Sequence, residues 1–284
     1  MSERFQKLVD LMAALRAPNG CPWDRKQTHE TLRPYLLEET YEVLDAIDHH
    51  DPAKLSEELG DVLLQVLFHS RIAGEAGSFT VEDVMDRLAD KLVRRHPHVF
   101  ADGGKDPTAT NAEQVLARWE DIKKAERQAE GRSESVFDGV PPTLPALLRA
   151  YQIQARASRV GFDWNHDQAG FDQVLTKIEE EIRELRTAIR VPPSETSPST
   201  RQQDIAAEFG DILFSLVNLS RFVKVNPEDA LRQSINRFVE RFRFIERQAA
   251  QSGRAVGDLS FDEMNQWWDE AKRRVSEKAQ ESLE

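Results

Sequence analysis

An acidic motif that occurs twice limits what this 284-residue chain can fold into. Each half carries the pattern EExxE followed by ExxD, at residues 38–42 and 58–61 in the first half and at 180–184 and 208–211 in the second. On an α-helix, both spacings place their carboxylates on one face within about a turn of each other. Two helices in each half therefore present four or five carboxylates to one point.

The residues that follow each ExxD indicate that these carboxylates lie near a core. The runs VLLQVLF at 62–68 and ILFSLV at 212–217 are apolar nearly all round, which is typical of a buried helix. Carboxylates at the head of such a helix need compensation, because removing an unpaired charge from water costs on the order of several kcal/mol. Hard cations that prefer oxygen ligands meet this need, above all Mg²⁺, with Mn²⁺ able to replace it.

A lone acidic cluster on a helix is usually no more than a solvated face. Here each cluster is paired with an ExxD that leads into an apolar helix, and the whole arrangement occurs twice. Because buried carboxylates need compensation, we predict metal binding in both halves rather than two solvated faces.

The fold is predicted to be all-α, because apolar residues recur at helical spacing in nearly every segment and strand-like alternation is scarce. The internal repeat extends beyond the acidic motifs, since GCPWD at 20–24 corresponds to GFDWN at 161–165. We expect two tandem four-helix domains, at 1–130 and 144–284. Residues 131–143, rich in Gly, Ser and Pro, form the expected linker, and the polar stretch 191–200 is the expected loop between the acidic motifs of the second half.

Three shorter features predict local structure without chemistry. The acidic pairs at 82–83 and 228–229 are expected at helix starts, where they complement the helix dipole. The adjacent histidines at 49–50 precede Asp-Pro and are interpreted as a polar turn, although two histidines can also bind a transition metal.

The composition limits the compartment and the partners. The net charge is −12, from 50 acidic and 38 basic residues, so nonspecific attraction to nucleic acid or to an anionic membrane is not expected. Cys21 is the single cysteine, which excludes a disulfide within the chain and fits a reducing compartment. The N-terminal segment is amphipathic and charged, unlike a signal peptide, and no apolar run reaches membrane-spanning length. We expect a soluble, cytoplasmic protein.

Mg²⁺ held by carboxylates commonly acts on phosphates, because it keeps several waters and completes its shell with substrate oxygens. A triphosphate such as that of ATP also needs cations near the metal. Lys177 lies one turn before Glu180, and a second basic pair follows on a later helix. This pair, Arg237 and Arg241, is four residues apart on one face, although a solvated basic face is the alternative interpretation. Trp268 is able to stack on a nucleobase, while core packing is the usual role of Trp.

Beyond these motifs, the chain resembles the MazG family of nucleoside triphosphate pyrophosphohydrolases. The resemblance covers nearly the whole chain and rests on GCPWD, LEETYEVLDAI, ELGDVLLQV, KLVRRHPHVF and LARWEDIK in the first half and on LPALLRA, VGFDW, EFGDILF, VNLSR and WW in the second. It implies an all-α, Mg²⁺-dependent enzyme that forms a homodimer and cleaves nucleoside triphosphates to monophosphate and pyrophosphate. Such an enzyme, broad in base preference, would clear nucleoside triphosphates or abnormal nucleotides.

The resemblance also implies roles for individual residues. In such enzymes the second and third Glu of EExxE and both acids of ExxD hold the metal. Activity is implied chiefly in the C-terminal domain, with nucleotide contacts at Lys177, Arg237, Arg241 and Trp268. Glu180, beside the ligands rather than among them, is the candidate general base. The implied metal ligands are Glu39, Glu42, Glu58 and Asp61 in the first half and Glu181, Glu184, Glu208 and Asp211 in the second.

The chain departs from the family pattern at a few positions. Arg237 stands where a Lys is usual, and Asp204 stands where another Lys can contribute. We expect these departures to alter the affinity for phosphate. At position 237, Arg preserves the charge of Lys but not its geometry. Tyr35 stands at the place of Lys177 in the first half, so we expect the N-terminal site to hold metal better than triphosphate. The alternative to an enzyme is a helical dimerisation or regulatory module that has lost catalysis and binds Mg²⁺ only structurally. The intact ligand sets argue against it.

Overall fold

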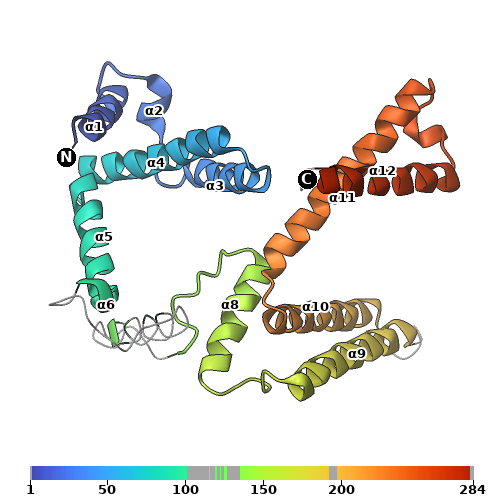
Figure 1. The fold of residues 1–284 in the computed structure, drawn as a ribbon. Helices are drawn as coiled ribbons and strands as arrows, with labels where there is room; N and C mark the ends of the chain where they lie inside the picture. The colour runs from blue at the N-terminus through green and yellow to red at the C-terminus, as the bar shows by residue number, and fades with distance from the viewer. Residues whose placement is uncertain are drawn as a thin grey trace. The chain divides into compact units, whose positions relative to one another are not determined.

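We describe the protein from a computed structural model, which covers residues 2–100, 115, 119, 122, 125–126, 135–191 and 197–281. The described residues form helices and turns with no strand among them, which confirms the all-α prediction. The chain divides into two compact units, Met1–Ala129 and Glu130–Glu284, and each is considered by itself (Figure 1). Of the proposed linker at 131–143, residues 135–143 are described and contain turns but no helix.

The N-terminal unit is built around a long helix, α4, whose apolar residues contact several neighbours. Helix α3 packs along α4, and α1 and α5 also contact it, while the short helix α2 follows α1 (Figure 1). The helices are α1 (Glu3–Arg16), α2 (Pro22–Lys26), α3 (Arg33–Asp48), α4 (Pro52–Glu75), α5 (Val81–Arg95) and α6 (Pro97–Phe100). The acidic motifs lie on α3 and at the start of α4, so the packing of this pair brings them together.

The C-terminal unit is also helical, and its acidic motifs likewise lie on a packed helix pair. Helices α9 and α10 pack side by side, α8 contacts α10 and α11, and α11 turns back through η1 into α12 (Figure 1). The helices are α8 (Ala146–Arg159), α9 (Gln168–Arg190), α10 (Pro198–Phe222), α11 (Pro227–Gln251), η1 (Val256–Asp258) and α12 (Phe261–Glu281). Within the described parts of the chain, none of these helices is both long and apolar enough to cross a membrane.

The helices begin where the sequence supplies caps. Asp51, Ser197 and Asn226 each accept hydrogen bonds from backbone N–H groups of the first turn, and each is followed by Pro, which needs no such partner. The acidic pairs 82–83 and 228–229 lie in the first turns of α5 and α11, as predicted. The histidines at 49–50 form the predicted turn between α3 and α4.

The expected loop at 191–200 is shorter than its sequence suggested. Helix α9 continues to Arg190 and α10 begins at Pro198, and residues 192–196 lie outside the described part of the chain. The connection therefore leaves both acidic motifs of this half within regular helix.

Two small cores hold the helices in place. In the N-terminal unit, Met12, Leu32 and Phe68 are buried together, with Ile72 packed against them. In the C-terminal unit, residues of α11 and the η1 region form a second cluster against which Trp268 packs. Within one chain, Trp268 therefore packs against this core.

Candidate active site

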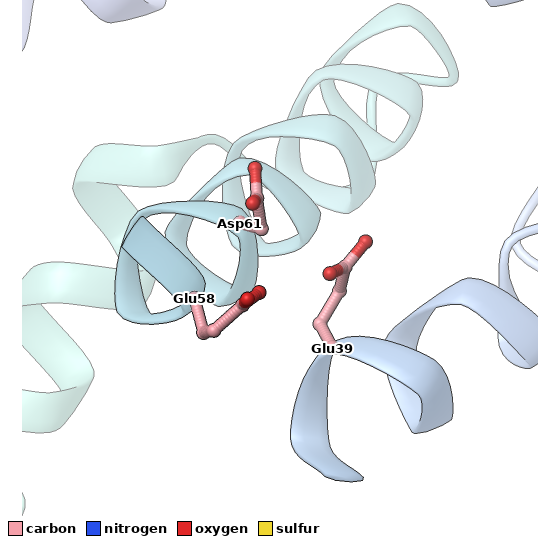
Figure 2. Close-up of side chains that lie close together, drawn as sticks. All are labelled: Glu39, Glu58 and Asp61. Atoms are coloured by element: carbon pink, nitrogen blue, oxygen red, sulfur yellow. The ribbon is translucent and has the colours of Figure 1, made fainter. Parts of the chain in front are cut away.

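The helix pair α3–α4 brings three of the four implied N-terminal ligands together. Glu39 projects from α3, and Glu58 and Asp61 project from the first turns of α4. Each residue offers a carboxylate oxygen, and these oxygens lie within 4.8 Å of one another. Figure 2 shows the three carboxylates facing the gap between the two helices. Glu58 is 6% exposed, so one of these charges is almost removed from water.

The pKa values of two carboxyl groups in this cluster are raised. Burial raises the pKa of the Glu39 carboxyl, and the nearby acids, Asp61 first, raise it further. Burial also raises the pKa of Glu58, which shares a hydrogen bond with Glu42. The fourth implied ligand, Glu42, therefore lies against Glu58, although it is outside the group of three whose oxygens lie within 4.8 Å.

A matching cluster lies between α9 and α10. Glu181 and Glu184 from α9 and Glu208 from α10 bring carboxylate oxygens within 4.8 Å of one another, and Glu181 is 5% exposed. Burial raises the pKa of Glu208, and the neighbouring carboxylates, Glu184 and Asp211 foremost, raise it further. Asp211 is thus close enough to repel Glu208 but stands outside the group of three.

Lys177 supplies the C-terminal cluster with a cation of its own. Its Nζ atom lies 2.8 Å from a carboxylate oxygen of Glu181 and 3.3 Å from one of Glu180. The hydrogen bond to Glu181 raises the pKa of Lys177, so the ammonium form is favoured. Glu180, the candidate base, is therefore held beside the cluster by Lys177. Tyr35, at the corresponding place in the N-terminal unit, brings no charge.

Both clusters fit a hard divalent cation. Each presents carboxylate oxygens only, which suits ions such as Mg²⁺, Mn²⁺ or Ca²⁺ better than a soft metal. The raised pKa values of Glu39, Glu58 and Glu208 show that unneutralised charge is unfavourable at these places. A bound cation would remove that penalty, so both groups of carboxylates are suited to metal.

A cavity of about 670 Å³ adjoins the C-terminal cluster. Both charged and apolar residues line it, as do Ser215 and Asn218 of α10. The charged residues are Lys177, Glu181, Asp211, Asp163 and Arg221, and the apolar ones include Phe137, Trp164 and Phe214. We call this space the C-terminal cavity. Acids, a cation and an apolar surface therefore face one volume.

The loop between α8 and α9 is fixed against this cavity by a buried ion pair. Asp163 and Arg221 are each 8% exposed and are joined by a hydrogen bond. Burial alone would raise the pKa of Asp163, but hydrogen bonds from Arg221 and Ser158 outweigh it and lower the pKa. Gly161, with φ of +88°, provides the left-handed turn that begins the loop. The wall that contains Trp164 is thus anchored to α10.

The remaining implied nucleotide contacts form a separate group. The Arg241 guanidinium lies over the Trp268 ring at 5.6 Å from its centroid, and Phe238 contacts the same ring. Arg237 lies one turn before Arg241 on α11 and is exposed. Within one chain, none of these residues lines the C-terminal cavity. The structure thus brings Lys177 to the metal cluster but not Arg237, Arg241 or Trp268.

Sequence reasoning assigned no role to three polar residues of the cavity, Gln154 on α8 and Ser215 and Asn218 on α10. Ser215 and Asn218 follow the ExxD motif on the same helix, but neutral side chains within an apolar run carry no signal for a site. One indication was available: Gln154 is a polar residue within the amphipathic run that forms α8. Its position on the inner face of that helix would have marked it as buried.

Comparisons with known proteins identify relatives over the whole length. The MazG nucleotide pyrophosphohydrolase domain matches residues 27–100, which contain the N-terminal cluster. The chain is 45% identical over 269 residues to the nucleoside triphosphate pyrophosphohydrolase/pyrophosphatase MazG of Thermotoga maritima, covering 94% of this chain and 95% of that protein. It is 43% identical over 272 residues to the nucleoside triphosphate pyrophosphohydrolase of Escherichia coli K12, covering 95% and 98%. YabN of Bacillus subtilis is 45% identical over 268 residues, which are 94% of this chain and 51% of YabN.

The repulsion within the C-terminal cluster predicts how metal affects stability. Substituting Glu208→Gln removes one of the crowded charges, so the melting temperature without metal should rise, on the order of a few degrees. The same change removes a ligand, so the further rise on adding millimolar Mg²⁺ or Mn²⁺ should be smaller than in the unsubstituted protein. Thermal denaturation in EDTA and in each metal measures both effects.

The matched control is Glu179→Gln, which removes the same charge from an exposed position of α9 outside the cluster. It should leave the metal-dependent rise unchanged. If Glu208→Gln and Glu179→Gln respond to metal identically, Glu208 does not take part in metal binding.

Proposed function

The chain belongs to the MazG nucleotide pyrophosphohydrolase family, and on this basis we propose that it hydrolyses nucleoside triphosphates to nucleoside monophosphate and pyrophosphate. It is a hydrolase acting on phosphoric anhydride bonds. The reaction is proposed to take place in the C-terminal unit. The single cysteine fits a reducing compartment and supports the proposal that the protein works in the cytoplasm.

The observation that carries this proposal is the composition of the C-terminal cavity. A nucleoside triphosphate has a highly charged end, which needs metal and cations, and an apolar end with a few polar groups. The cavity is lined by Lys177, Glu181 and Asp211 and also by aromatic side chains. Ligand sites are commonly apolar with a small number of placed polar groups, and this cavity follows that rule.

We propose Mg²⁺ as the metal. Glu181, Glu184 and Glu208 would hold it, with Asp211 completing the group, and the equivalent acids would hold a cation in the N-terminal unit. When bound in such a site, Mg²⁺ supplies charge neutralisation for phosphate oxygens and acidifies a coordinated water.

The protein's own residues have separate roles in this proposal. Lys177 neutralises Glu181 in the free protein. With a divalent cation bound at Glu181, the ammonium group of Lys177 would be able to donate a hydrogen bond to a phosphate oxygen instead. Glu180 lies one turn after Lys177 on α9, and its carboxylate is partly exposed, so it is placed to accept a proton from water. Glu184 and Asp211 then serve as ligands rather than as bases.

We further propose that the enzyme is a homodimer in which the second copy completes the site. Apolar residues recur every seven positions along α9 and remain exposed, namely Leu175, Ile182 and Ile189. Such a stripe is typical of a helix that packs against another helix. Arg241 and Trp268 do not line the cavity of their own chain. In the proposed dimer, these two residues would contact a nucleotide that is bound in the cavity of the other chain.

The product decides the proposed function. Each nucleoside triphosphate incubated with the protein and Mg²⁺ should give monophosphate and pyrophosphate in equal amounts, with no orthophosphate until an inorganic pyrophosphatase is added. Hydrolysis in ¹⁸O water followed by mass spectrometry locates the bond that is cleaved. Orthophosphate and nucleoside diphosphate as the initial products would refute the proposal, and the absence of any cleavage would favour a regulatory module.

Matched substitutions test which unit is catalytic. Asp211→Asn and Asp61→Asn each remove one acidic charge at equivalent places while preserving the shape of the side chain. Asp211→Asn should lower kcat by roughly a hundredfold or more, because both water activation and charge neutralisation depend on the metal. Asp61→Asn should retain most of the activity and mainly reduce the stabilisation by Mg²⁺. Equal losses of kcat in two folded variants would mean that both units contribute to turnover.

Mixing two inactive variants tests whether the site is shared between chains. Asp211→Asn and Arg241→Ala should each have little activity alone. If each site draws Asp211 from one chain and Arg241 from the other, half of the sites in a mixed dimer are intact. Random reassortment would then restore about a quarter of wild-type activity. Activity that stays at the level of the separate variants, in samples that native mass spectrometry shows to be mixed, would mean that each chain forms its own site.

A further inference from the structure

Gln154 is a polar residue of the C-terminal cavity whose side-chain amide has an unsatisfied hydrogen-bond acceptor. It lines the cavity from α8 and is 5% exposed. Its Nε2 atom donates to the main-chain oxygen of Phe214 at 2.8 Å, which sets the orientation of the side-chain amide. Its Oε1 atom has no hydrogen-bond partner among the described residues. A buried acceptor without a hydrogen bond costs free energy, and a ligand with an N–H donor would remove this cost.

The surroundings of Gln154 are suited to a flat heterocycle. Aromatic side chains of Phe137, Trp164 and Phe214 line the same cavity, and aromatic rings stack on every nucleobase. The Asp163–Arg221 ion pair holds the loop that carries Trp164, so this wall is in place before a ligand arrives. Lys177 and Glu181 line the same cavity, so the acidic cluster that is proposed to hold the metal and the phosphates borders this space.

The repeat allows a comparison with the N-terminal unit at the place of Asn218. Seven residues after the last acid of ExxD stands Asn218 in one half and Phe68 in the other. Phe68 is 3% exposed and packs in the N-terminal core, with its ring 6.4 Å from that of Trp23. An aromatic side chain of the protein thus occupies the position that faces the cavity in the C-terminal unit.

From these observations we infer that the nucleobase binds in the C-terminal cavity against its aromatic side chains and that Gln154 Oε1 accepts a hydrogen bond from a base N–H. The inference rests on the proposed function, because it concerns the base of the same nucleoside triphosphate. Bases with an N–H donor at this point are preferred over analogues without one. Gln154 is therefore a specificity-determining residue.

Analogue pairs that differ only in the donor test this inference. Adenine carries its N–H donors on one amino group, so ATP is compared with purine riboside triphosphate, and UTP is compared with N3-methyl-UTP. In the wild-type enzyme, the analogue of at least one pair should have a kcat/KM about tenfold lower. In Gln154→Met, which keeps the length of the side chain without the acceptor, the difference should fall below about twofold. Gln152→Met, on the same helix but outside the cavity, should keep the wild-type ratio.

Each result has a defined meaning. Equal kcat/KM within both pairs in the wild-type enzyme would overturn the inference, as would a difference that persists in Gln154→Met. The wild-type comparison needs no variant, so it remains decisive if Gln154→Met does not fold. A protein that cleaves none of the four nucleotides would refute the proposed function instead. Dissociation constants of the same four nucleotides, measured by calorimetry with Ca²⁺, would then test Gln154 by the same tenfold ratio.

Discussion

The crowding of carboxylates between two packed helices is the constraint on which the rest of this protein depends. Glu58 and Glu181 are almost fully buried and face further acids across the α3–α4 and α9–α10 interfaces. Like charges this close destabilise the helix pair unless some are protonated or a cation is present. The helix packing and the proposed cation binding are therefore linked, because the contacts that bury the acids also create the repulsion that a cation would relieve.

The two units differ in whether a basic side chain lies beside the crowded carboxylates. In the C-terminal unit, Lys177 lies 2.8 Å from Glu181 and neutralises part of the cluster without any metal. In the N-terminal unit, Tyr35 occupies the corresponding place, and both Glu39 and Glu58 have raised pKa values. A cation within the chain is available to move to a phosphate when metal arrives, whereas a tyrosine is not. This difference favours substrate binding in the C-terminal unit on electrostatic grounds alone.

Local features of the sequence predicted the helices and the acidic clusters well. The clusters follow from helical spacing, and the starts of α5 and α11 follow from acidic first turns, because both depend on residues within a turn or two of each other. The cavity could not be predicted in this way. Gln154 and Phe214 are sixty residues apart, and only the packing of α8 on α10 joins them. The separation of Arg241 and Trp268 from the cavity likewise depends on where α11 and α12 pack.

The differences between the halves are concentrated around one place. Lys177 and Asn218 border the C-terminal cavity, and Tyr35 and Phe68 stand at the corresponding positions of the N-terminal unit. The acids themselves are the same in both halves. A repeat that keeps the acids but lacks the cation and the polar side chain at the cavity retains what a cation needs and not what a nucleotide needs. We therefore propose that the N-terminal cluster is a metal site that stabilises its helix pair and that nucleotide recognition is confined to the C-terminal unit.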